Sequence, residues 1–275
     1  MYKLLVSDID ATLIDSDFRV PEYNEKMIQR AREAGVEFML CTGRIYGAAR
    51  PYAKRLGLSP DIPIITSNGA VTIDWQTGEV VFGTPIDPEL CGEIFDILDD
   101  MDMYYHFYCK NTFYTRKFYE GGRFVKLMNE SLPPEEKFAT LETDDPHGVA
   151  KIDPVYKISA RLENKVDYDR FMAIFGPRTD IEITSSFKDN YEISAKGVNK
   201  GTAVAKYAEL KGIRPEEIMT FGDNHNDIEM IQYAGVGVAV GNAVDELKAA
   251  ADYITDTNEN GGVGKAIAKF VFGEE

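Results

Sequence analysis

Short apolar runs alternate with amphipathic stretches in the first and last parts of this chain. Residues 3–7 are too few for a helix and predict a buried strand that ends at Asp8. Residues 21–34 carry apolar side chains at helical spacing, and Gly35 suits the left-handed position after a helix. Residues 36–41 predict a second strand. This order of strand, helix and strand predicts two parallel strands joined by a right-handed crossover.

Turn residues continue to separate the apolar runs beyond the second strand. Residues 63–66 predict a third strand, and residues 70–74 and 80–83 predict a hairpin. Further along, helices are predicted at 200–211, 226–233 and 243–251, and strands at 217–221 and 235–240. We therefore predict an α/β domain with a Rossmann-like, doubly wound parallel sheet, built from residues 1–84 and 191–275.

The middle of the chain, residues 85–190, is rich in aromatic residues and lacks this alternation. We interpret it as a second, α+β domain inserted into the first, with mainly antiparallel strands. Helices are predicted at 88–100, near 120–130 and at 166–175, strands at 103–108, 112–115, 154–161 and 180–185, and a polar loop at 132–145. The aromatic residues at 104–119 are interpreted as core of this domain, with substrate contact by tyrosine or histidine as the alternative.

The amino-acid composition argues against several classes of binding partner. The chain has 275 residues, with 30 lysine and arginine residues against 46 aspartate and glutamate residues, which gives a formal net charge of −16. This balance argues against nucleic acids and anionic membranes as partners. The three cysteines lack C-x-x-C spacing and predict neither a disulfide framework nor a zinc site. No apolar run approaches the ~18 residues of a membrane span. We expect a cytoplasmic protein that is a monomer or a weak homodimer.

Polar residues follow the first two predicted core strands. Asp8, Asp10 and Thr12 follow the first strand, although two acids separated by one residue also suit a solvated turn. Thr42-Gly43-Arg44 follows the second strand and offers a hydroxyl and N–H groups to an anion. Both groups lie at the carboxyl ends of strands, which is the edge where open parallel sheets bind ligands.

Two more polar groups come from the C-terminal part of the chain. Lys200 opens a helix, where its charge opposes the helix dipole and favours a nearby anion, although it also suits the surface. Asp223, Asn226 and Asp227 follow the strand at 217–221 and offer the hard oxygen ligands that Mg²⁺ prefers. Carboxylates, a metal, a hydroxyl and a lysine at one sheet edge predict phosphoryl transfer, because cations must offset the repulsion between a carboxylate and a phosphate.

These motifs resemble those of the haloacid dehalogenase (HAD) superfamily of hydrolases, and within it the Cof-type phosphatases with an inserted type C2B cap. The resemblance covers the whole chain and rests on five motifs in order, Asp8-x-Asp10-x-Thr12, Thr42-Gly43-Arg44, Ser67-Asn68-Gly69-Ala70, Gly197-x-x-Lys200-Gly201 and Gly222-Asp223-Asn224-x-Asn226-Asp227-x-x-Met230. Ala11 departs from the pattern, because the family usually has glycine at this position. Its methyl group restricts the backbone of the turn.

The resemblance implies a role for each acidic residue. Asp8 would be the nucleophile that forms an aspartyl-phosphate, and Asp10 the general acid and base. Mg²⁺ would be held by the Asp8 carboxylate, the Asp10 backbone carbonyl and Asp223, with Asp227 as a ligand directly or through water. Lys200 would neutralise the developing charge.

The resemblance also assigns the phosphate contacts to Thr42, the Gly43 N–H, Lys200 and Asn226. The implied function is Mg²⁺-dependent hydrolysis of small phosphorylated metabolites, such as sugar phosphates or phosphorylated cofactors. The alternatives are a phosphomutase with the same chemistry, a receiver-like signalling module, and a catalytically silent protein that binds phosphorylated metabolites. The long insertion argues against the receiver-like module, and the presence of both Asp8 and Asp10 argues against the silent protein.

Overall fold

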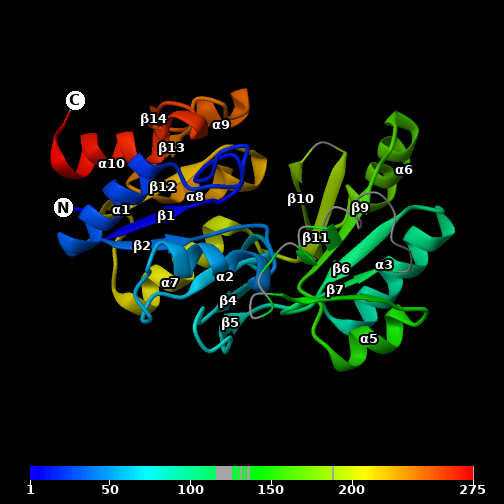
Figure 1. Cartoon of the computed structure of the whole chain (residues 1–275). Coiled ribbons are helices and arrows are strands. Elements are labelled where there is room, and N and C mark those ends of the chain that lie inside the picture. The colour runs from blue at the N-terminus through cyan, green and yellow to red at the C-terminus, as the bar shows by residue number, and fades with distance from the viewer. Residues whose placement is uncertain are drawn as a thin grey trace.

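A parallel sheet of five strands forms the centre of one half of the molecule (Figure 1). The computed structural model describes residues 1–115, 126–127, 129–130, 132, 134, 137–187 and 189–274. The strand order is β14-β13-β12-β1-β2, and all neighbouring pairs are parallel. The strands are β1 (Leu4–Ser7), β2 (Glu37–Leu40), β12 (Ile218–Gly222), β13 (Val236–Ala239) and β14 (Tyr253–Ile254). The predicted parallel sheet is confirmed.

Helices cover both faces of this sheet, because successive apolar strand residues point to opposite sides. Leu5 shares a core cluster with Met27 and Ile267, whereas Leu4 shares another with Tyr207. The helices are α1 (Glu22–Glu33), α7 (Lys200–Lys211), α8 (Ile228–Tyr233), α9 (Asp245–Ala250) and α10 (Gly262–Phe272). We did not predict α10, whose glycine-rich start is typical of a loop.

A small antiparallel sheet adjoins β2. It consists of β3 (Ile64–Thr66), β4 (Val71–Ile73) and β5 (Val80–Gly83), in that order. A parallel bridge between Cys41 and Ile65 connects the end of β2 to this sheet. The predicted hairpin is confirmed as β4 and β5. Between β2 and β3 lies α2 (Tyr46–Arg55), which we did not predict and which contains Pro51, a residue unfavourable inside helices.

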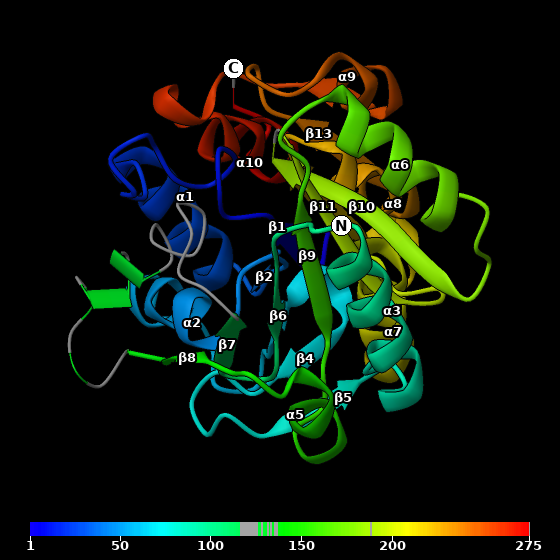
Figure 2. The same cartoon turned by 90° about the vertical axis from the view of Figure 1, so that its right-hand side faces the viewer.

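The middle of the chain forms a six-stranded sheet with the order β10-β11-β9-β6-β7-β8. Neighbouring strands are antiparallel except for β7 and β8, so the predicted α+β pattern is confirmed. The strands are β6 (Tyr105–Tyr108), β7 (Thr112–Thr115), β8 (Ala139–Glu142), β9 (Lys157–Arg161), β10 (Ile181–Phe187) and β11 (Asn190–Ala195). On the face turned away from the parallel sheet lie α3 (Pro88–Asp100), α5 (Pro146–Ile152) and α6 (Lys165–Phe175) (Figure 2).

Several details of this region differ from the sequence-based expectations. The loop predicted at 132–145 contains β8, a largely exposed edge strand without the alternation of a half-buried strand. We also missed α5, although Asp145 caps its first turn and Pro146 opens it. The sheet includes β11 and so extends to Ala195, beyond the predicted domain division between residues 190 and 191. The helix predicted near 120–130 lies largely outside the described residues.

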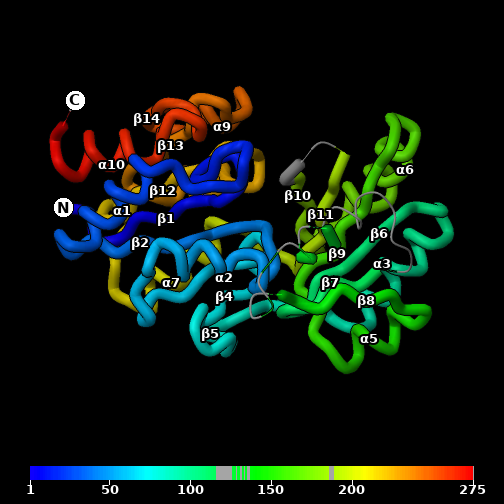
Figure 3. The backbone as a smooth tube through the Cα atoms, in the orientation of Figure 1, coloured from blue at the N-terminus to red at the C-terminus, as the bar shows by residue number. Residues whose placement is uncertain are grey.

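The two sheets are joined by the connections at 84–87 and 196–199. The chain ends lie on the side of the parallel sheet away from the six-stranded sheet (Figure 3). The carboxyl ends of the parallel strands face the other way, where the Lys157 ammonium of β9 donates a hydrogen bond to the Gly43 carbonyl (2.8 Å). Among the described helices, none is long and apolar enough to cross a bilayer.

Candidate active site

The loops after β1, β2 and β12 lie at one edge of the parallel sheet, because these strands are adjacent and parallel. They carry Asp8, Thr42 and Asp223. Lys200 reaches the same edge from the first residue of α7. The start of α7 is fixed by Asn199, whose side chain accepts the N–H of Thr202 (2.8 Å). Side chains from four separate segments therefore meet at this edge.

Lys200 is the buried cation of the site. Its side chain has no solvent exposure, and its Nζ lies 2.7 Å from Asp8 Oδ1 and 2.5 Å from Asp227 Oδ1. Burial lowers the Lys200 pKa, but the charges of Asp227 and Asp8 outweigh burial and raise it. The ammonium therefore stays charged, and it ties the first strand of the sheet to the loop after β12.

Asp227 is fully buried, and both of its carboxylate oxygens are in use. Oδ1 accepts from Lys200, while Oδ2 accepts the N–H groups of Asp223 (3.0 Å) and Asn224 (3.1 Å). Gly222 allows this close approach, since a Cβ on it would lie 2.5 Å from the Asp227 Cβ. These bonds fix the position of the Asp227 carboxylate. The Asp223 carboxylate is held separately, because its Oδ1 accepts a hydrogen bond from the Thr12 hydroxyl (2.8 Å).

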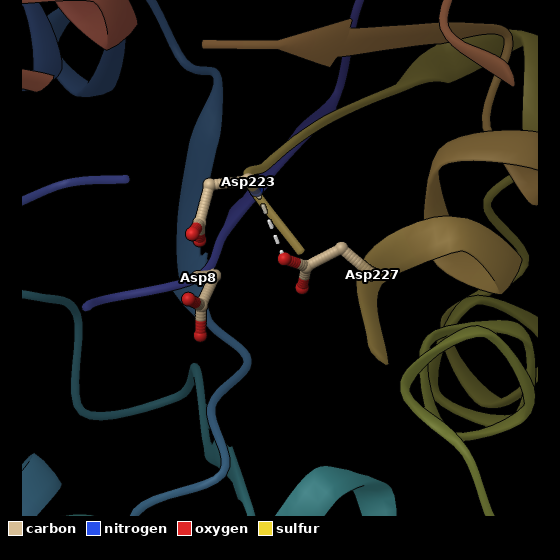
Figure 4. Close-up of side chains that lie close together, drawn as sticks. All are labelled: Asp8, Asp223 and Asp227. Carbon is tan, nitrogen blue, oxygen red and sulfur yellow. Dashed lines mark hydrogen bonds between the residues drawn. The ribbon is translucent and has the colours of Figure 1, made fainter. Parts of the chain in front are cut away.

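The three carboxylates form a cluster of excess negative charge (Figure 4). One oxygen from each of Asp8, Asp223 and Asp227 lies within 4.8 Å of the others. Burial raises the pKa of Asp8 to about 7, although Lys200 opposes the rise. Burial, then the charges of Asp227 and Asp8, raise the pKa of Asp223 to about 8. The three carboxylates outnumber the single ammonium of Lys200, and their oxygens are hard donors. A divalent cation therefore fits at this position.

Asp10 lies beside this cluster and pairs with Arg44. Arg44 donates from Nε to Asp10 Oδ2 (2.7 Å) and from Nη2 to Asp10 Oδ1 (2.5 Å). Burial raises the Asp10 pKa, but the charge and hydrogen bonds of Arg44 outweigh burial and lower it. The next residue, Ala11, has a φ of 53°, so the position where the family usually has glycine does require the left-handed conformation.

The candidate phosphate-binding residues Thr42, Gly43 and Asn226 lie at the loops after β2 and β12. Thr42 is fully buried, and its Oγ1 accepts the Arg44 N–H (3.2 Å). Asn226 is also buried and donates from Nδ2 to Asn68 Oδ1 (3.1 Å). Gly43 lies against the same asparagine, since a Cβ on Gly43 would be 2.8 Å from Asn68 Oδ1. Asn68 thus connects the turn after β2 with the loop after β12.

Arg44, Thr12 and Asn68 stand in the sequence motifs, but their contacts could not be predicted from those motifs. Lys157 and Glu192, which reach this edge from the six-stranded sheet, were not predicted as site residues. The available signal was alternation in β9, where Lys157 shares a strand face with other polar residues among apolar neighbours.

The sequence model of the haloacid dehalogenase-like hydrolases matches residues 5–267. The chain belongs to this family. This HAD hydrolase is 32% identical to 5-amino-6-(5-phospho-D-ribitylamino)uracil phosphatase YcsE of Bacillus subtilis, over 98% of this chain and 96% of that protein. It is 26% identical to pyridoxal phosphate phosphatase YbhA of Escherichia coli, over 98% of this chain and 97% of that one.

Solved structures agree with this assignment. A haloacid dehalogenase-like hydrolase from Bacillus subtilis superposes with a TM-score of 0.86 at 25% identity, covering 98% of this chain and 99% of that chain. A haloacid dehalogenase-like hydrolase from Bacteroides thetaiotaomicron superposes with a TM-score of 0.80 at 27% identity, covering 98% and 99%. The HAD resemblance and the expected fold class are confirmed.

Proposed function

We propose that this chain is a Mg²⁺-dependent phosphatase that hydrolyses small phosphorylated metabolites through an aspartyl-phosphate. The observation that carries the proposal is the Asp8 carboxylate at the open edge of the sheet, held 2.7 Å from the buried Lys200 ammonium. A buried cation against one oxygen keeps this carboxylate oriented and favours its ionised, nucleophilic form. The relatives named as phosphatases of phosphorylated metabolites support the substrate class.

The reaction proceeds in two displacements. A carboxylate oxygen of Asp8 attacks phosphorus, the bond to the leaving-group oxygen breaks, and Asp10 gives its proton to that oxygen. Water then attacks the phosphorus of the aspartyl-phosphate while Asp10 takes a proton from it, and the bond to Asp8 breaks to release phosphate. Thr42, the Gly43 N–H, Lys200 and Asn226 hold the phosphoryl oxygens as charge develops on them.

The contact between Arg44 and Asp10 affects the protonation state that Asp10 needs in each displacement. Its bidentate contact favours ionised Asp10, which is the form that accepts a proton from water in the second displacement. The first displacement needs protonated Asp10. Arg44 must therefore loosen its contact with Asp10 when substrate binds.

The metal ligands in this proposal are the Asp8 carboxylate, the Asp10 backbone carbonyl and Asp223. Mg²⁺ supplies charge neutralisation for the acids and the phosphoryl group when bound. Because both Asp227 oxygens are already in hydrogen bonds, we assign Asp227 to orienting Lys200 and the loop after β12, with contact to the metal through water.

In this proposal one domain carries the catalytic residues and the other selects the substrate. Residues 1–84 and 196–275 carry the chemistry, while residues 85–195 form the cap that selects the substrate, because β11 (Asn190–Ala195) belongs to the cap sheet although the division predicted from the sequence fell after residue 190. We keep the expectation of a cytoplasmic monomer or weak homodimer. Size-exclusion chromatography with light scattering checks the oligomeric state.

Phosphate release from a panel of sugar phosphates, nucleotides and phosphorylated cofactors tests the function. We expect release with Mg²⁺, loss of release with EDTA, and recovery on adding Mg²⁺ back. Activity unchanged by EDTA would refute the metal requirement, and no release from any substrate would refute the phosphatase. With a hexose monophosphate, a product phosphorylated at another hydroxyl would instead indicate a phosphomutase.

A further inference from the structure

A buried ion pair of the six-stranded sheet contacts the turns that we propose bind phosphate. Lys157 Nζ of β9 lies 2.6 Å from Glu192 Oε1 of β11, and both side chains are almost fully buried. Lys157 also donates to the Gly43 carbonyl (2.8 Å), and Glu192 Oε2 accepts from Asn68 Nδ2 (2.7 Å). The pair therefore belongs to one sheet but directs its remaining hydrogen bonds to the other half of the molecule.

Asn68 extends these contacts to the far side of the site. Its Oδ1 accepts from Asn226 Nδ2 (3.1 Å), so both ends of its amide group are bonded and its orientation is fixed. Its backbone N–H donates to the Thr42 carbonyl (3.0 Å). The residue sits in the left-handed region with a φ of 57°, a conformation that asparagine tolerates and that surrounding contacts must hold.

We propose that Lys157 and Glu192 are positioning residues for the phosphoryl group. Lys157 fixes the turn at Gly43, and Glu192 fixes Asn68, which in turn aims the Asn226 amide at the phosphoryl oxygens. The inference rests on the proposed function, because the phosphate contacts of Gly43 and Asn226 belong to it. Contact between the six-stranded sheet and the turns at Gly43 and Asn68 thus orders the residues that we propose bind phosphate.

The energetics of buried ion pairs indicate that the Lys157–Glu192 pair positions Gly43 and Asn68 and is not needed simply to stabilise the fold. Desolvation of two charges offsets most of their attraction, so apolar residues of similar size often stabilise a fold as well or better. What apolar residues cannot reproduce is the direction of the hydrogen bonds to Gly43 and Asn68. The ring of Tyr108, whose centroid lies 4.5 Å from Lys157 Nζ, covers the ammonium and limits its alternatives to these partners.

Two double variants separate the roles. Lys157→Met/Glu192→Leu replaces the pair with apolar side chains and removes both hydrogen bonds to the other half of the molecule. Lys157→Met/Glu192→Gln also has no net buried charge, but it keeps a carbonyl that accepts from Asn68. Glu93→Gln is the matched control, because Glu93 pairs with Arg178 at the surface of α3.

The measurements are kcat and KM for p-nitrophenyl phosphate, the competitive Ki of inorganic phosphate, and the Tm of each protein. In the Leu variant we expect KM and the phosphate Ki to rise about tenfold or more, as for loss of one or two hydrogen bonds. Its Tm should fall, because the Gly43 carbonyl and the Asn68 amide lose these partners, although the protein is also spared the cost of burying two charges. The Gln variant should show a smaller rise, about threefold, and the control none.

A phosphate Ki within about twofold of wild type in both double variants would overturn the inference, whatever happens to Tm. The Gln variant alone decides the matter if the Leu variant does not fold. A change in KM for p-nitrophenyl phosphate without a change in phosphate Ki would also overturn it, because the pair would then act on the leaving group. A wild-type protein that neither hydrolyses this substrate nor gains Tm with inorganic phosphate contradicts the proposed function and the inference together.

Discussion

Replacing Lys200 with methionine removes the cation that holds the acidic cluster together. The Lys200 Nζ lies 2.7 Å from Asp8 and 2.5 Å from Asp227. At an effective dielectric constant of about 20, the Coulomb attraction in each of these pairs is about 6 kcal/mol. Burying the ammonium costs several kcal/mol, and the two acids remain buried in the variant. We expect Lys200→Met to lower the free energy of unfolding by about 3 to 5 kcal/mol, a large share of a typical total of about 5 to 15 kcal/mol.

The assay is urea unfolding of the protein in EDTA, followed by circular dichroism, with the free energy taken by linear extrapolation. The matched control is Lys206→Met on the same helix, because Lys206 is exposed and its ammonium only lies over the Phe82 ring at 4.6 Å. That variant should lose about 0.5 to 1 kcal/mol.

A second substitution tests the cause of the loss. In Lys200→Met/Asp227→Asn, one buried charge without a partner is removed, while the amide oxygen can still accept the N–H groups of Asp223 and Asn224. Part of the lost stability should return, so the two substitutions should be non-additive. A loss below about 1 kcal/mol for Lys200→Met, or no recovery in the double variant, would refute the reasoning that this ammonium neutralises the acids.

Three further predictions follow from single residues. Ala11→Gly should raise the free energy of unfolding by about 1 kcal/mol, because alanine is strained at a φ of 53°; an unchanged urea midpoint would contradict this. Burial, together with the Lys157 charge, lowers the pKa of His106 to about 3, so His106 by itself should subtract about 2 kcal/mol from the free energy of unfolding as pH falls from 7 to 5, because it takes up its proton only in the unfolded state. The difference in free energy of unfolding between wild type and His106→Gln should change by this amount between the two pH values, and a constant difference would contradict the prediction. Asp8→Asn should abolish phosphate release, whereas Asp10→Asn should keep phosphate binding by calorimetry; turnover by Asp8→Asn protein would rule out the proposed nucleophile.

Local patterns predicted helices in both halves of the molecule. The bounds of α7 and α3 were predicted to the residue, because apolar spacing and helix-ending residues are local signals. Gly212 ends α7 in the left-handed conformation, as its position after the helix indicated. In the six-stranded sheet the same reasoning missed β8 and β11, since an edge strand and a strand with polar residues owe their conformation to pairing with distant partners.

The sequence by itself predicted which residues meet at the candidate active site. Asp8, Thr42, Lys200 and Asp223 follow strands or open a helix, and parallel strands must bring such positions to one edge of a sheet. These positions are also what the family resemblance rests on. No tertiary information was needed to place them together.

Only the tertiary structure decided how these groups are bonded and charged. That Arg44 holds Asp10, that Lys200 pairs with Asp227, and that a lysine and a glutamate of the second sheet reach the turns at Gly43 and Asn68 depend on contacts between distant segments. Motif spacing carries no information on such pairings. The reason is physical: burial and neighbouring charges set the pKa and orientation of each group, and both arise only when distant segments of the chain pack together.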